Sequence, residues 1–140
     1  ELKSVAFRHV KNDLVPKETM AITMIKPEEL KAHSFFESHC WAKLKTIVFC
    51  AVEWNGTNSE EARLLKVASL DFAEDDDLIK EIKVDYDFIR NKLVTQGFAA
   101  LTGTDGKWIQ ARTKGAGHGS TSRAFYARTS LVKKIFKIAS

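Results

Sequence analysis

The stretch Glu1-Leu2-Lys3-Ser4-Val5-Ala6-Phe7 opens the chain and decides its fold. Glu1 and Lys3 run directly into an apolar tract, Ser4 to Arg8, that is typical of a β-strand. Residues i and i+2 of a strand point to the same side, so the carboxylate and the ammonium are expected to converge. No methionine, cap or polar lead-in precedes Glu1. We therefore expect the chain to start inside a motif.

The next residues predict alternating strands and helices. Thr19 to Ile25 is rich in β-branched side chains and predicts a second strand, joined to the first by a hairpin-like connection at residues 11–17. Pro27 predicts the start of a short helix, because Glu28 and Glu29 favour the positive end of a helix dipole. Residues 35–45 are expected to be helical, and residues 45–54 and 64–70 to be strands.

A long amphipathic helix is predicted in the second half of the chain. Apolar residues recur there at three-to-four-residue spacing, and Gly97 is expected to end the helix. The Asp105-Gly106 turn predicts a hairpin of residues 98–102 with 107–111. A short strand at 124–126 and a helix from about residue 130 complete a mixed α/β pattern. With no internal repeat or linker, residues 1–140 are predicted to form a single domain.

Composition excludes several classes of protein. With 140 residues and 44% hydrophobic content, the chain suits one folded domain and not disorder, collagen or a coiled coil. Cys40 and Cys50 lie in apolar tracts and match neither a disulfide framework nor a zinc pair, so buried free thiols in a reducing cytoplasm are expected. No apolar run has the length needed to cross a bilayer.

The charge is unevenly distributed along the chain. Residues 101–140 hold eight lysine and arginine residues and one acid, Asp105, which gives a net charge of +7, whereas the first hundred residues carry −3. Such a basic segment predicts a surface that faces a polyanion. A solvated C-terminal helix explains Lys133, Lys134 and Lys137, but it explains Arg112 and Lys114 less well.

Glu1 and Lys3 have the chemistry of a metal-dependent nuclease site. A carboxylate can hold Mg²⁺, and a neighbouring ammonium can orient the attacking water and offset charge on a phosphate. The E-x-K spacing alone also fits a surface ion pair. The acids at 71 and 74–77 are a rival metal site, but their place before a long helix is explained by capping and by the helix dipole.

Other motifs do not support a different chemistry. The glycines at 115, 117 and 119 match neither the P-loop nor the dinucleotide pattern, and they leave open a loop that approaches a nucleic-acid backbone. His33, His39 and Cys40 do not have a metal-ligand spacing. No nucleophile pattern for acyl transfer is present.

Four motifs in order resemble a known family. They are E-L-K at Glu1 to Lys3, S-H-x-x-x-K-L-K at Ser38 to Lys45, R-x-K at Arg112 to Lys114, and R-A-F-Y at Arg123 to Tyr126. This order is similar to that of the MutH-like endonucleases, which comprise mismatch-repair nicking enzymes and type II restriction enzymes that recognise GATC. The resemblance implies a restriction-endonuclease-like α/β fold of the PD-(D/E)xK type, with a central mixed β-sheet flanked by helices.

The resemblance also implies residue roles. Glu1 is expected to bind Mg²⁺, with Lys3 as the catalytic lysine and Lys43 as a further active-site lysine. Arg112, Lys114, Arg123 and Tyr126 are expected to contact DNA, since arginine suits guanine and lysine suits phosphate. The family's first catalytic aspartate precedes E-x-K, so we expect it to lie before Glu1 and this fragment to be inactive without it.

The segment between Arg112 and Tyr126 favours the restriction-enzyme branch, which acts on double-stranded DNA at GATC. The alternatives are a mismatch-repair nicking enzyme that works with a partner ATPase, and a non-catalytic DNA-binding or allosteric copy of the fold. No membrane partner is expected.

Overall fold

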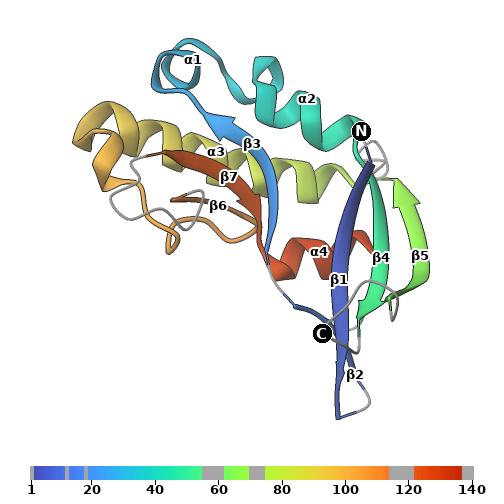
Figure 1. Cartoon of the computed structure of the whole chain (residues 1–140). Coiled ribbons are helices and arrows are strands. Elements are labelled where there is room, and N and C mark those ends of the chain that lie inside the picture. The colour runs from blue at the N-terminus through green and yellow to red at the C-terminus, as the bar shows by residue number, and fades with distance from the viewer. Residues whose placement is uncertain are drawn as a thin grey trace.

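The computed structural model of the protein describes residues 2–11, 13–17, 19–54, 62–69, 75–113 and 122–136. Its described strands form two sheets (Figure 1). The four-stranded sheet has the order β2-β1-β4-β5, with β1 (Leu2–Val10), β2 (Asp13–Pro16), β4 (Val48–Trp54) and β5 (Ala62–Ser69). The three-stranded sheet has the order β3-β7-β6, with β3 (Met20–Ile25), β6 (Ile109–Thr113) and β7 (Arg123–Ala127).

The larger sheet is mixed. β1 pairs with β4 in parallel, whereas β2 and β5 join it antiparallel at the two edges. The smaller sheet is antiparallel throughout. The flanking helices are α1 (Pro27–Ala32), α2 (His39–Thr46), α3 (Asp76–Gln96) and α4 (Thr129–Ile135), with 3-10 turns η1 (Phe35–Glu37) and η4 (Phe98–Ala100). The predicted mixed α/β fold is thus confirmed, with its strands divided between two sheets.

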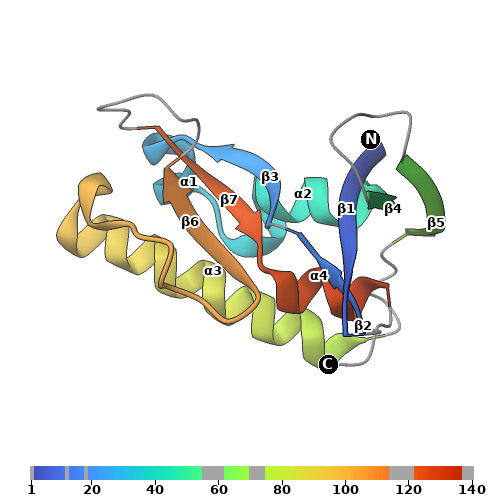
Figure 2. The ribbon, with the colours of Figure 1, turned by 60° about the horizontal axis from the view of Figure 1, so that its bottom comes forward.

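Two helices hold the sheets together. The ring of Phe136, directly after α4, meets the rings of Phe7 in β1 and Phe49 in β4 with centroid distances of 5.5 and 6.3 Å. Figure 2 shows α4 reaching from the end of β7 toward β1 and β2. On the other side, Tyr86 of α3 stacks on Phe125 of β7 at 5.6 Å. These buried aromatic contacts fix the position of the smaller sheet relative to β1.

The sequence predicted α3 correctly. Its N-cap is Asp75, whose carboxylate accepts the backbone N–H of Leu78 at 3.1 Å, and its C-cap is Gly97 with φ +92°. The four residues that carried the predicted spacing, Leu78, Ile82, Ile89 and Leu93, are all buried. The capping role expected for the acidic run is confirmed for Asp75, while residues 71–74 of that run lie outside the described residues.

The hairpin predicted for residues 98–102 and 107–111 is wrong. Residues 98–100 form η4, and β6 pairs with β7 instead. A buried carboxylate accounts for the difference: Asp85 of α3 accepts the backbone N–H groups of Lys107, Trp108 and Ile109 at 2.9, 2.6 and 3.1 Å. The backbone N–H groups of residues 107 and 108 therefore bond to Asp85 and not to a neighbouring strand. β6 begins at the next residue, Ile109.

Two further local expectations differ from the structure. The strands at 2–10 and 20–25 are not joined as a hairpin, because β1 turns at Lys11, with φ +50°, into the short strand β2. The helix expected over 35–45 is divided at Ser38. The Ser38 hydroxyl donates to Phe35 O at 2.5 Å and accepts from Trp41 N at 3.1 Å, so it ends η1 and caps α2.

Both cysteines are buried free thiols, as expected. Burial raises the pKa of the Cys40 thiol, which keeps it in the inert protonated form. Within the described parts of the chain, none of the helices combines the length and the apolar character that a membrane span requires.

Candidate nucleic-acid interface and active site

Lys3 lies near the start of β1, at the position that pairs with Phe49 of β4. It shares a face of the sheet with Val5 and Phe7, which are buried, and is itself half-buried. The strand that the E-x-K motif predicted is therefore present and central in its sheet. Glu1, the proposed metal ligand, lies outside the described residues.

Lys43 is exposed on α2, on the side of a groove. The groove is lined by Thr23, His39, Ala42, Lys43 and Thr46 and so runs between β3 and α2. His39 lies one helical turn before Lys43 in α2. Its Nδ1 atom is 3.1 Å from a carboxylate oxygen of Glu29 in α1. The serine of the S-H-x-x-x-K-L-K motif, Ser38, caps α2, so it has a structural role. The first lysine of the motif, Lys43, is exposed at the surface.

The structure brings Arg112 and Tyr126 together. β6 pairs with β7 so that Gln110 faces Tyr126 and Arg112 faces Ala124, which places Arg112 diagonally beside Tyr126 on the same face. The Arg112 guanidinium carbon lies 5.1 Å from the Tyr126 ring centroid. In addition, Arg112 donates from Nη1 to the hydroxyl of Thr19 at 2.9 Å. These contacts hold an exposed guanidinium in one place on the outer face of the smaller sheet.

Arg123 is not with this pair. It lies on the opposite face of β7, where its Nε donates to Leu101 O at 3.2 Å and its guanidinium lies 5.5 Å from the ring centroid of Phe98. Lys114 lies outside the described residues. Of the four residues expected to contact DNA, the structure therefore places two side by side and one elsewhere.

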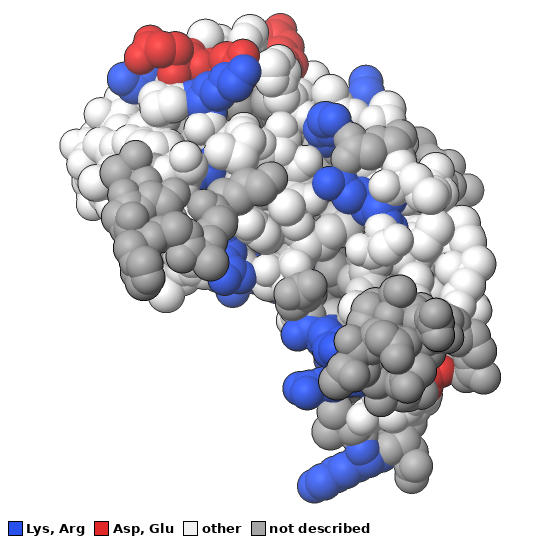
Figure 3. Space-filling model, viewed as in Figure 1, with Lys and Arg blue, Asp and Glu red and all other residues white. Residues whose placement is uncertain are grey.

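Some of the positive side chains in residues 101–140 are engaged by partners within the protein. Lys107 Nζ lies 3.2 Å from a Glu81 carboxylate oxygen, and Arg128 donates from Nη2 to Gly103 O at 2.7 Å. Positive side chains from the first half of the chain compensate: exposed lysines and arginines there include Arg8, Lys11, Lys17, Lys26, Lys43 and Lys45. Figure 3 shows Lys and Arg along the inner edge of the curved molecule, while the acidic side chains in this view lie mainly over α1.

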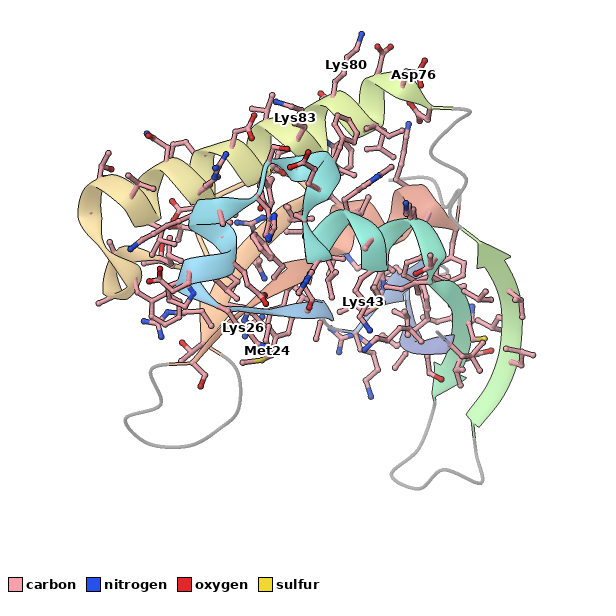
Figure 4. All side chains as sticks on the ribbon, turned by 90° about the horizontal axis from the view of Figure 1, so that it is seen from above. Met24, Lys26, Lys43, Asp76, Lys80 and Lys83 are labelled. Atoms are coloured by element: carbon pink, nitrogen blue, oxygen red, sulfur yellow. The ribbon has the colours of Figure 1, made fainter. Side chains whose placement is uncertain are left out.

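Side-chain direction separates two sides of the molecule. In Figure 4, Lys26 and Lys43 lie on the side where the β-strands are, and Asp76, Lys80 and Lys83 of α3 lie on the opposite side. Lys26, directly after β3, and Lys43 of α2 thus belong to the same side as the groove beside Lys43. A polyanion on this side meets lysines without the acids at the start of α3.

The described residues do not by themselves form a metal site. Among them, no group of three or more histidine, cysteine or acidic side chains is arranged to hold a metal ion. Glu1 and residues 71–74 lie outside this part of the chain, so this finding does not test them as metal ligands. Binding by Glu1 stays a prediction.

The sequence does not predict the contact that positions Arg112. Thr19 is expected only to start a strand, yet its hydroxyl accepts the Arg112 hydrogen bond. Because Thr19 directly precedes β3 and Arg112 lies in β6, 93 residues further along the chain, no local spacing relates them. The only usable signal was the presence of a short hydroxyl side chain at a strand end.

A comparison with protein-family models matches residues 1–82 to MutH, described as DNA mismatch repair enzyme MutH. The matched range includes β1, with Lys3, and α2, with Lys43, and it ends inside α3. β6 and β7, which carry Arg112 and Tyr126, follow it in the chain. No curated protein matches the chain.

Proposed function

Because this chain belongs to the MutH family of DNA endonucleases, we propose that it hydrolyses phosphodiester bonds of double-stranded DNA at a short specific site. The proposed site is GATC, the proposed cofactor is Mg²⁺, and the proposed role is that of a type II restriction enzyme. The observation that carries site-specific action is the Arg112–Tyr126 pair, an exposed guanidinium fixed against an aromatic ring on the outer face of the smaller sheet.

This pair has the chemistry of base reading. A guanidinium can donate two parallel hydrogen bonds to O6 and N7 of guanine in the major groove, and two-stranded β-ribbons fit in that groove. The contacts to Thr19 and Tyr126 restrict the Arg112 side chain before DNA arrives, which lowers the entropy lost on binding. We assign base reading to Arg112 and Tyr126, and phosphate contact to Lys114. Arg123, which contacts Leu101 and Phe98, is proposed to support the β7 end of this surface.

The proposed catalytic residues are Glu1, Lys3 and Lys43. Mg²⁺ held by Glu1 would neutralise phosphate charge and supply an activated water. Lys3 is proposed to orient the attacking water, and Lys43, which is exposed beside the groove, to stabilise negative charge on the phosphate. Their ammonium groups act as fixed positive charges, so no proton transfer is assigned to them.

The test uses supercoiled plasmid that contains GATC sites, incubated with the full-length protein in Mg²⁺ or in EDTA. We expect linear product with Mg²⁺ and none with EDTA. The Lys3→Ala variant should give no linear product but should still bind DNA. The matched control is Lys80→Ala, which removes an exposed lysine from the opposite side of the molecule (Figure 4) and should cleave normally.

Other outcomes identify the alternatives. Open-circular product that increases with a mismatch-repair ATPase would replace the restriction role by a nicking role. Specific binding without any Mg²⁺-dependent cleavage would indicate a non-catalytic copy of the fold. Undiminished cleavage by Lys3→Ala would remove that residue from the mechanism.

A further inference from the structure

Met24 is an exposed methionine on the face of the sheet that carries Arg112 and Tyr126. It pairs across β3 and β7 with Ala124, and Ala124 pairs across β7 and β6 with Arg112. The three residues form one row, so Met24 and Arg112 flank the small Ala124 on the same face. Met24 is 39% exposed, whereas Ala124 between them is fully buried.

A register shift in β3 gives Met24 this direction. Met20 and Ile22 are buried, and strict alternation along the strand would bury Met24 and expose Ile25. The pairing of β3 with β7 shifts register between Ala21 and Thr23. Beyond this shift the alternation is reversed, so that Ile25 is buried at 5% exposure and Met24 is exposed. β-Bulges commonly re-aim side chains beside functional sites. The core therefore does not require a methionine at position 24.

Met24 shares its side of the molecule with the proposed catalytic lysine. The preceding residue, Thr23, points to the opposite face of β3 and lines the groove beside Lys43. In Figure 4, Met24, Lys26 and Lys43 lie on the same side of the molecule. A duplex that presents a phosphate to Lys43 and a base edge to Arg112 would pass over Met24.

The thioether chain of Met24 cannot bind phosphate, because it is apolar and uncharged. An apolar side chain between cations on a DNA-facing sheet fits an apolar group on a base edge. In the major groove of unmodified DNA, the apolar group is the C5-methyl of thymine. We propose that Met24 is a specificity-determining residue that packs against a thymine methyl group of the recognition site. This inference rests on the proposed function.

The test compares the wild-type protein with Met24→Ala on two duplexes, in Ca²⁺ buffer. One duplex contains GATC, and in the other the thymine of this site is replaced in both strands by uracil, which lacks the methyl group. For the wild type, we expect the uracil duplex to bind about fourfold more weakly, the effect of one buried methyl group. For Met24→Ala, the two duplexes should bind equally.

Two further variants make the result specific. Met24→Leu keeps an apolar side chain and should retain a preference for thymine. Val84→Ala removes an apolar side chain that is 65% exposed on α3 and should leave the wild-type preference unchanged. Equal affinity of the wild type for both duplexes would overturn the inference, as would an undiminished thymine preference in Met24→Ala. Failure of the proposed function is distinguishable, because the wild type would then bind GATC no better than a scrambled duplex.

Discussion

The guanidinium of Arg112 lies against the ring of Tyr126, at 5.1 Å, although the two residues belong to different strands. If this pair reads a base, alanine at either position should weaken binding to a GATC duplex by on the order of 1–3 kcal/mol and weaken binding to a scrambled duplex much less. The measurement is a pair of titrations for each variant in Ca²⁺ buffer. Equal losses on both duplexes would show that neither residue discriminates sequence.

The pair should also be energetically coupled. Replacing either residue also removes its contact with the other, so the two single variants share part of their loss of binding free energy. The double variant should therefore lose less binding free energy than the sum of the two single losses. Strictly additive losses would indicate that the two side chains act independently on DNA.

Lys43 offers a test of catalysis that is separate from binding. In a cleaving form of the protein, Lys43→Ala should slow single-turnover cleavage on the order of a hundredfold, because one fixed charge at the phosphate is removed. Lys45→Ala is the matched control: it is also exposed on α2 but two residues further, on a different side of the helix. Equal slowing by both variants would point to general electrostatics instead of a defined catalytic position.

Asp85 predicts a large effect on stability. Asp85 is 6% exposed, and its carboxylate accepts three backbone N–H groups at the start of β6. Asp85→Ala leaves these donors without their partner and should lower the free energy of unfolding by on the order of 3 kcal/mol. Urea unfolding measures this change. Asp87→Ala breaks a half-exposed pair with Lys83 and should lower it by less than about 1 kcal/mol; similar losses for both would contradict the role of Asp85.

Tyr86 predicts a pH dependence of stability. Its hydroxyl donates to His33 O at 2.9 Å, and burial raises the pKa of Tyr86 to about 12. In the unfolded chain a tyrosine titrates near pH 10, so the neutral form is favoured by folding. Its contribution is complete below about pH 10 and is lost as pH rises toward 12.

Tyr86→Phe removes both effects. At pH 7 it should lower the free energy of unfolding by about 1 kcal/mol through the lost hydrogen bond. As pH rises from about 10 to 12, the stability of the wild type should fall more steeply than that of the variant. Unfolding curves collected across this range decide the matter, and a constant difference between the two proteins would rule out titration of Tyr86 as the cause.

The sequence by itself determined the features that depend on near neighbours along the chain. The strand after Lys3 was predicted because its apolar tract identifies it locally. α3 was predicted because the cap Asp75, the spacing from Leu78 to Leu93 and Gly97 all lie within one continuous segment. The motif that contains Lys43 was also visible in the sequence, since its residues are consecutive on a capped helix.

Only the tertiary structure decided which strands meet and where their side chains point. The turn at Asp105-Gly106 has the sequence of a hairpin, but Asp85 from α3 takes the N–H groups that the hairpin needed. Arg112 and Tyr126 become neighbours through the β6–β7 pairing, and Met24 joins their face through a register shift within β3. Backbone hydrogen bonds can be satisfied by partners anywhere in the chain, so local propensity does not select among them. That choice depends on the packing of the whole molecule, and it placed the candidate DNA-reading residues side by side.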